Sequence, residues 1–217
     1  MYVCPAEGFS DQCSWEIQRS RFITVIARVD SEDEARDTIE LVRSQFPDAR
    51  HHCHAFIIHT EGAQPREHSS DDGEPAGTAG RPMLDVLRGS GMENILAVVV
   101  RYFGGIKLGT GGLVKAYSHS VELGLELVPR VRRSIQTLLA LDLAHSEAGK
   151  VEAELRGRGV SIAETTYGAH VTLTLASPEK EIEGLQALVA SITQGEGELR
   201  GAGEEWVEHP LAEGEHR

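Results

Sequence analysis

The sequence Ile95-Leu-Ala-Val-Val-Val-Arg-Tyr-Phe-Gly-Gly-Ile-Lys-Leu-Gly-Thr-Gly-Gly112 joins an apolar run to a glycine-rich turn. The run from Ile95 to Val100 has the length and the β-branched side chains of a buried strand. From Leu113 the apolar residues recur with helical spacing, and Thr110 is placed to cap the helix that begins there. The stretch therefore predicts a buried strand that turns directly into a helix.

The turn between this strand and this helix is a candidate site for binding anions. A helix N-terminus presents unpaired N–H groups and a partial positive charge, and glycines let an anion approach the backbone closely. The candidate binding residues are Arg101, Gly104, Gly105, Lys107, Gly109, Thr110, Gly111, Gly112 and Lys115. Their spacing matches neither the P-loop nor the dinucleotide-binding fingerprint. A turn that needs glycine only for its positive φ angles is the alternative interpretation.

The residues before this stretch predict further strands and helices of the same domain. We expect strands at 21–29 and 51–59 and a short helix at 83–88. The segment Ser31-Glu-Asp-Glu34 is a capping box, so a second helix begins there, and Pro47 marks its end.

A long loop from Thr60 to Gly80 separates two of these elements, and long loops in compact domains are often functional. Its candidate functional residues are Asp71, Asp72, Gly73, Glu74 and Thr78. The carboxylates could hold Mg²⁺ or transfer protons, although their spacing fits neither an EF-hand nor a known hydrolase motif. The alternative is a turn-rich loop whose Asp side chains accept hydrogen bonds from backbone N–H groups.

The segment His51-His-Cys-His54 contains the side chains that usually bind zinc. Strand alternation, however, places His52 and His54 on one face and Cys53 on the other. We therefore expect a buried Cys53, partly exposed histidines, no metal site and no cofactor.

The residues after Pro129 predict a second domain. From 134 to 208 the pattern reads strand, helix, strand, strand, helix, strand, which is the ferredoxin-like arrangement. We place the domain boundary at the cluster Arg130-Val-Arg-Arg133. The expected fold is thus α+β with two domains, 1–133 and 134–208, followed by a disordered acidic tail at 209–217.

The charge of the chain restricts what it binds. Its 21 Lys+Arg and 34 Asp+Glu residues give a net charge of −13, which disfavours indiscriminate binding to polyanions. Residues 1–133 have a net charge of −4 and residues 134–217 a net charge of −9. The stretch from Asn94 to Val121 nevertheless contains Arg101, Lys107 and Lys115 and no carboxylate. A local positive patch is therefore expected in an acidic protein.

No apolar run approaches the length of a membrane span, so we expect no membrane partner. The three cysteines form no CxxC pair, which suits free thiols in a reducing cytoplasm.

Two segments resemble the signature segments of the IMPACT family, specifically its bacterial YigZ-type members. They are Asp71-Asp-Gly-Glu-Pro-Ala-Gly-Thr-Ala-Gly-Arg-Pro-Met-Leu84 and Val98-Val-Val-Arg-Tyr-Phe-Gly-Gly-Ile-Lys-Leu-Gly-Thr-Gly-Gly-Leu-Val-Lys-Ala-Tyr117, and Ser20-Arg-Phe-Ile23 and Ala49-Arg-His-His-Cys53 resemble further family segments. The resemblance implies an N-terminal domain similar to the second domain of ribosomal protein S five and a ferredoxin-like C-terminal domain. It also implies that Arg101, Lys107, Lys115 and the two glycine-bearing loops form one surface.

Eukaryotic relatives in this family regulate translation through protein partners, which suggests a function. We expect a non-enzymatic, translation-linked regulatory factor that binds RNA, the ribosome or a translation protein through the basic glycine-rich surface, without DNA sequence specificity. The alternative is a small-molecule or phosphate-handling enzyme that uses Asp71, Asp72 and Glu74. A third hypothesis is a protein-interaction adaptor that uses the acidic C-terminal domain, whose only aromatic residues are Tyr167 and Trp206.

Overall fold

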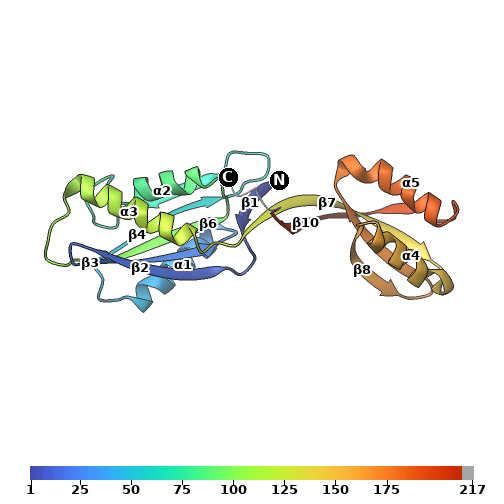
Figure 1. Ribbon diagram of the computed structural model, residues 1–217, viewed down its shortest axis with the longest axis horizontal. Helices are drawn as coiled ribbons and strands as arrows, with labels where there is room; N and C mark the ends of the chain where they lie inside the picture. The colour runs from blue at the N-terminus through green and yellow to red at the C-terminus, as the bar shows by residue number, and fades with distance from the viewer. Residues whose placement is uncertain (212–217) are drawn as a thin grey trace. The chain divides into compact units, whose positions relative to one another are not determined.

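The computed structural model describes residues 1–211 and divides into two compact units (Figure 1). The first domain comprises Tyr2–Arg132 together with the described residues 208–211, and the second domain comprises Arg133–Val207. The division falls within strand β7 (Arg130–Leu143), whose first residues belong to the first domain. The predicted α+β class and two-domain organisation are confirmed.

The first domain is built on a five-stranded sheet with the strand order β2-β3-β6-β4-β5. These strands are β2 (Ser10–Ile17), β3 (Ser20–Arg28), β4 (His51–Ile58), β5 (Arg66–Ser70) and β6 (Ile95–Tyr102), preceded by β1 (Tyr2–Pro5). Every neighbouring pair in this sheet is antiparallel. The apolar run predicted to be a buried strand is therefore the central strand, β6.

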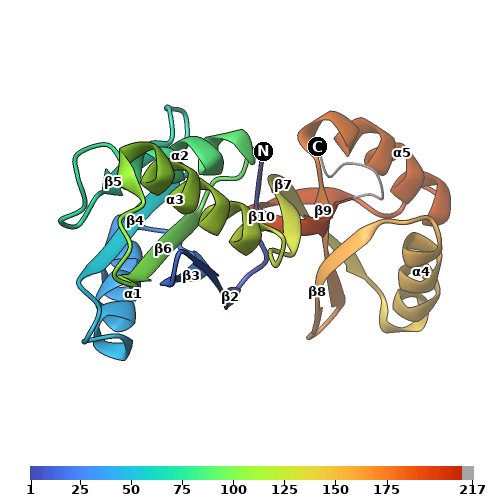
Figure 2. The ribbon, with the colours of Figure 1, turned by 60° about the vertical axis from the view of Figure 1, so that its left-hand side comes forward.

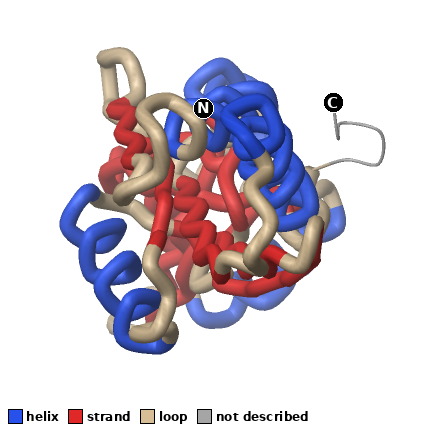
Figure 3. The backbone as a smooth tube through the Cα atoms, turned by 90° about the vertical axis from the view of Figure 1, so that its left-hand side faces the viewer, coloured by secondary structure: helices blue, strands red, loops and turns tan. Residues whose placement is uncertain are grey.

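Helices cover both faces of this sheet. Helix α1 (Glu32–Gln45) packs on one face, and α2 (Gly80–Gly89) and α3 (Gly109–Leu125) pack on the other. Figure 3 shows helices on opposite sides of the strands. Successive side chains of β6 enter different cores, with Ala97 and Val99 beneath α2 and α3 and with Val98 and Val100 beneath α1. An antiparallel sheet is thus buried on both faces, which explains why β6 is continuously apolar.

The predicted capping box at Ser31 is present, with one variation. Ser31 Oγ accepts a hydrogen bond from the Glu34 backbone N–H at 3.1 Å. The Glu34 carboxylate accepts from the backbone N–H of Asp30 at 2.7 Å, one residue before the position that the motif predicts. The helix nevertheless begins where the sequence indicated.

The sequence interpretation missed three strands of this domain and misplaced one helix cap. The sequence analysis predicts neither β1 nor β2. Strand β5 lies inside the stretch 60–80, for which the composition predicts a loop. Strand β5 is a polar edge strand, so it lacks the apolar alternation that marks a half-buried strand. Helix α3 begins at Gly109, so Thr110 lies in its first turn, and Leu108 occupies the N-cap position without a side-chain hydrogen bond.

The second domain has the ferredoxin-like order of elements that the sequence predicted. Strand β7 is followed by α4 (His145–Gly157), β8 (Ser161–Tyr167), β9 (Val171–Ser177), the short helix η1 (Glu179–Glu181), α5 (Ile182–Ile192) and β10 (Leu199–Pro210). The strand order of this sheet is β1-β7-β9-β8, and β10 also pairs with β7. Helices α4 and α5 lie side by side (Figure 2) and share one core with Leu141, Leu173 and Leu175.

Strand β10 reaches Pro210 and so includes the first two residues of the stretch predicted to be a disordered tail. The remainder of that prediction, from 212 onward, lies outside the described residues. None of the described helices is long and apolar enough to cross a membrane.

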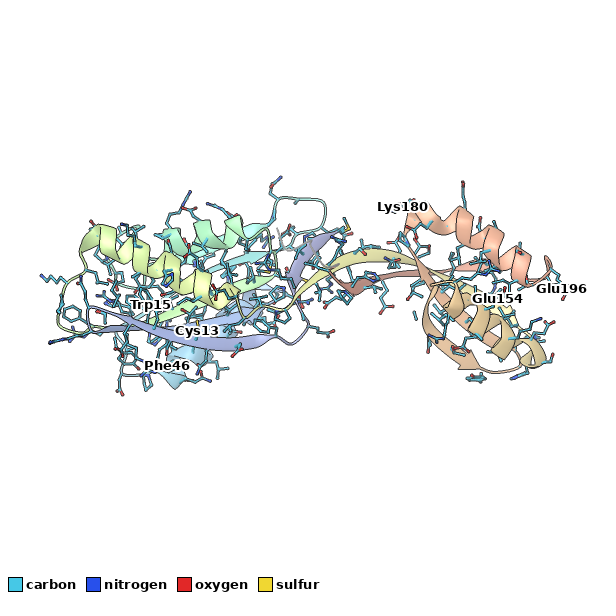
Figure 4. The ribbon with its side chains drawn as sticks, in the orientation of Figure 1. Cys13, Trp15, Phe46, Glu154, Lys180 and Glu196 are labelled. Atoms are coloured by element: carbon cyan, nitrogen blue, oxygen red, sulfur yellow. The ribbon has the colours of Figure 1, made fainter. Side chains whose placement is uncertain are left out.

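Close packing fixes helix α3 over the sheet. Trp15 of β2, labelled in Figure 4, donates a hydrogen bond from Nε1 to Ser120 Oγ at 2.7 Å. A Cβ atom added at Gly124 would lie 2.5 Å from Ile26 Cγ1, so the helix approaches β3 more closely than any other residue would permit. Helix α3 therefore has a defined position at both its middle and its end.

The turn before α3 packs just as closely at Gly104. Its backbone N–H donates to Ser20 Oγ at 3.2 Å, and an added Cβ would lie 2.0 Å from the carbonyl group of Arg19. We predict that Gly104→Ala lowers the free energy of unfolding by about 2–3 kcal/mol, because backbone atoms must move to relieve the overlap. Urea unfolding measures this change.

Gly111→Ala is the matched control, because Gly111 lies in α3 with open space where its Cβ would be. This substitution should leave stability unchanged or raise it by up to about 1 kcal/mol, as alanine favours helix more than glycine does. Equal urea-unfolding midpoints for Gly104→Ala and Gly111→Ala would contradict the packing that we describe for Gly104.

Candidate functional site

The glycine-rich turn and the acidic loop meet at one cleft of the first domain. The cleft has a volume of about 670 Å³, which lies within the range of small-molecule sites. It is lined by residues from the start of β4, the acidic loop, the end of β6, the turn and the start of α3, namely Asp48, Arg50, His51, Glu74, Pro75, Arg101, Tyr102, Phe103, Lys107, Leu108, Gly109, Thr110 and Leu113.

A buried ion pair joins the acidic loop to the end of β6 at this cleft. Arg101 Nη1 lies 2.6 Å from Glu74 Oε1, and the two side chains are only 7% and 4% exposed. The Tyr117 hydroxyl of α3 donates a hydrogen bond to the same carboxylate oxygen at 2.9 Å. Glu74 thus connects the acidic loop to both the central strand and helix α3.

Cys53 extends this buried network and does not line the cleft. Its Sγ lies 3.0 Å from the carbonyl oxygen of Asp71 and 3.3 Å from the hydroxyl oxygen of Tyr117. Burial raises the pKa of the Cys53 thiol to about 12, and burial together with the neighbouring Cys53 raises the pKa of Tyr117 well above its usual value. Both groups are therefore protonated at neutral pH, and Cys53 is not a thiolate nucleophile.

Asp71 holds the acidic loop and the start of α2 in place. Its carboxylate accepts hydrogen bonds from the backbone N–H groups of Gly77, Ala79 and Gly80 at 2.7, 2.9 and 2.8 Å. Burial acts to raise the pKa of Asp71, but the three N–H donors outweigh it and hold the pKa below its usual range. Asp71 thus occupies the N-terminus of α2 as a fixed anion.

Asp72 and Thr78 are also engaged within the protein. The Asp72 carboxylate accepts from the backbone N–H of His52 at 2.6 Å and from Arg43 of α1 at 2.9 Å. Thr78 Oγ1 donates to the carbonyl oxygen of Pro75 at 2.6 Å. Of the five candidate residues in this loop, Glu74 lines the cleft, whereas Asp71, Asp72, Gly73 and Thr78 do not.

The candidate residues of the glycine-rich turn also divide into two groups. Arg101, Lys107, Gly109 and Thr110 line the cleft, and Gly104, Gly105, Gly111, Gly112 and Lys115 do not. Gly105 and Gly109 have φ angles of +87° and +71°, which glycine adopts readily. The turn therefore uses glycine for its positive φ angles and also lines the cleft. The two interpretations of the glycine-rich sequence do not exclude each other.

The electrostatics of the cleft favour an anion. Helix α3 has no acidic residue in its first turn and no side-chain hydrogen bond at its N-cap, so its N-terminal N–H groups face the cleft without a protein anion. Arg50 and Lys107 add two positive charges there, and the exposed Asp48 adds one negative charge. The charge of Glu74 is matched by Arg101, so the acidic and basic side chains that line the cleft sum to one positive charge. The equivalent end of α2 is already occupied by Asp71.

Arg50 and Phe103 are among the cleft residues that the sequence analysis does not predict. Arg50 lies in the segment Ala49–Cys53, which resembles a family segment but does not indicate a role for Arg50. Phe103 is a large apolar side chain that is 55% exposed, and its ring centroid lies 5.6 Å from the guanidinium carbon of Arg101. An aromatic residue between a strand and a glycine turn is the signal that would have identified it.

The histidine segment has a different environment from the one predicted. Cys53 and the histidines lie on opposite faces as expected, but His52 and His54 are buried, with exposures of 6% and 8%. The prediction of partly exposed histidines is wrong for His52 and His54, because α1 covers this face of the sheet, whereas His51 is partly exposed. Among the described residues, no three His, Cys, Asp or Glu side chains are arranged to hold a metal ion.

The hydrogen bonds of Asp71 predict a pH-dependent stability. Folding lowers the pKa of this carboxyl below its unfolded value of about 4. The stabilisation by the carboxylate is therefore complete above the unfolded pKa and is lost as the pH falls through the folded pKa. We predict that Asp71→Asn lowers the free energy of unfolding by about 1–2 kcal/mol at pH 7. Relative to wild type, this loss should shrink as pH falls below about 4.

Glu61→Gln serves as the control, since Glu61 is exposed. Its unfolding curve should match that of the wild type at pH 7 and at pH 3. A loss in Asp71→Asn that is the same at pH 7 and pH 3 would contradict the role of the carboxylate charge.

Comparisons with known proteins assign the chain to a family. The Impact N-terminal domain matches residues 18–125, and a domain of unknown function (DUF1949) matches residues 141–196. The chain is 42% identical to the IMPACT family member YigZ of Escherichia coli and 37% identical to YvyE of Bacillus subtilis; each match covers 85% of this chain, and 90% and 84% of those proteins. A solved structure of a hypothetical protein is 41% identical with a TM-score of 0.60, covering 91% of this chain and 95% of that one. The chain belongs to the IMPACT family.

Proposed function

We propose that the protein is a non-enzymatic, translation-linked regulatory factor that binds RNA of the translation machinery through the cleft of its first domain. The main support is the N-terminus of α3, which has no capping side chain and opens on a cleft lined by Arg50, Arg101 and Lys107. The link to translation rests on membership of the IMPACT family, whose eukaryotic members regulate translation.

The distribution of charge supports a confined contact with a polyanion. The whole chain has a net charge of −13, so most of its surface repels phosphates. Two exposed cations in the cleft, Arg50 and Lys107, correspond to about two phosphate contacts. For single-stranded RNA, two contacts give a slope of about −1.4 in log K against log salt concentration.

The carboxylates of the acidic loop favour this binding function over the enzyme alternative. Asp71 and Asp72 are held by backbone N–H groups, and Glu74 is buried against Arg101. A general base must reach a substrate proton, and a nucleophile needs a neighbouring base. These three residues instead hold the loop in place.

The proposal predicts ribosome association that depends on salt and on charge in the turn. In a sucrose gradient of a lysate from the native host, the wild-type protein should migrate with ribosomal fractions at low salt and leave them at high salt. The double variant Lys107→Glu/Lys115→Glu should remain at the top of the gradient even at low salt, because it reverses two charges in the basic stretch.

A charge-matched control in the second domain is Lys150→Glu/Lys180→Glu, since both lysines are exposed (Lys180 is labelled in Figure 4). This control should migrate as the wild type does. Wild-type protein that stays at the top at low salt would contradict ribosome binding. Association that resists salt and both double variants would indicate a protein partner instead.

A further inference from the structure

We propose that the cleft holds a single nucleotide, with its phosphate at the N-terminus of α3 and its base against the ring of Phe103. This inference rests on the proposed function for the location of the site, and it adds the chemical unit that the site recognises. Three observations on the first domain support it: the free helix end, an unpartnered donor of Arg101 and an exposed aromatic ring.

The helix end provides the phosphate position. Helix α3 is a regular helix of 17 residues, and Gly109 and Thr110 of its first turn line the cleft. A Cβ atom added at Gly109 would meet nothing within 4 Å, so an anion can approach the backbone there. Lys107 lines the same cleft and adds an exposed positive charge.

The side chain of Arg101 supplies a second, independent indication of a ligand. Its Nη1 is paired with Glu74, but its Nε is buried and has no hydrogen-bond partner within residues 1–211. Buried polar groups are nearly always satisfied, so an unpartnered one calls for an explanation. Because Arg101 lines the cleft, an oxygen atom of a bound nucleotide is a suitable acceptor for this N–H group.

The aromatic ring indicates a base in addition to the phosphate. Phe103 is 55% exposed and lines the cleft together with the partly buried Tyr102 and Leu108. Exposed aromatic rings beside cations are the usual platforms on which proteins stack unpaired bases. A cleft of about 670 Å³ is also larger than a phosphate ion alone would fill. The combination fits a nucleotide better than it fits an inorganic anion.

Isothermal titration calorimetry with the full chain tests this inference. The probes are uridine monophosphate, adenosine monophosphate, uridine, inorganic phosphate and single-stranded hexauridylate. Both mononucleotides should bind, and uridine and inorganic phosphate should each bind at least about 10-fold more weakly, because each lacks one of the two contacts. Tighter binding of hexauridylate than of uridine monophosphate identifies RNA as the source of the nucleotide, and the reverse identifies free nucleotides.

Two pairs of variants distinguish the contact with the base from the contact with the phosphate. Phe103→Leu should weaken nucleotide binding about 5- to 100-fold, whereas Phe103→Tyr retains the ring and should bind as the wild type does. Lys107→Ala should weaken binding at least about 10-fold. Lys115→Ala removes an equal charge from the exposed surface of α3 outside the cleft and should have little effect. Thermal unfolding of each variant verifies that it is folded.

The inference would be overturned if inorganic phosphate bound as tightly as the mononucleotides, or if Phe103→Leu and Phe103→Tyr bound equally well. The experiments distinguish failure of the nucleotide site from failure of the proposed function. Ribosome association that depends on Lys107 and Lys115 but not on Phe103 leaves the proposed function in place and removes the nucleotide site. Nucleotide binding without ribosome association supports the nucleotide site and contradicts the proposed function.

Discussion

The buried ion pair between Glu74 and Arg101 holds the candidate site together. It connects an irregular loop, which has no regular hydrogen-bonding pattern of its own, to the central strand of the first domain. Tyr117 adds a hydrogen bond from helix α3 to the same carboxylate. Placing two charges in the interior is costly unless each is paired, so the pair restrains the acidic loop to the position in which it meets the end of β6.

This restraint explains how an acidic protein maintains a positive cleft. Glu74 is neutralised by Arg101, and Asp71 and Asp72 are turned toward the N-terminus of α2 and the start of β4. The carboxylates of the acidic loop are therefore engaged by the protein itself. The N-terminus of α3 lies at the cleft without a side-chain cap, and the cationic side chains that line the cleft outnumber the carboxylates. The C-terminal half of the same helix is fixed over the sheet by Trp15 and by close packing at Gly124.

Much of the fold could be predicted from the sequence, because its signals are local. The β-branched run of β6, the capping box at Ser31 and the strand and helix order of the second domain depend on neighbouring residues alone. Strand β5 could not be found this way, since an edge strand of polar residues is defined by its pairing with β4. The same holds for the site: the structural role of Asp71 depends on backbone N–H groups six to nine residues away, and Lys115 shares a helix with the cleft without lining it.

A double-mutant cycle on Glu74 and Arg101, measured by urea unfolding, tests the central role of this ion pair most directly. Glu74→Gln and Arg101→Met should each lower the free energy of unfolding by about 3–5 kcal/mol, because each leaves one charge buried without its partner. The double variant should lose at least about 2 kcal/mol less than the two single losses together, since it leaves no unpaired charge. Losses that add to within about 0.5 kcal/mol would show that the two residues act independently and would contradict the account.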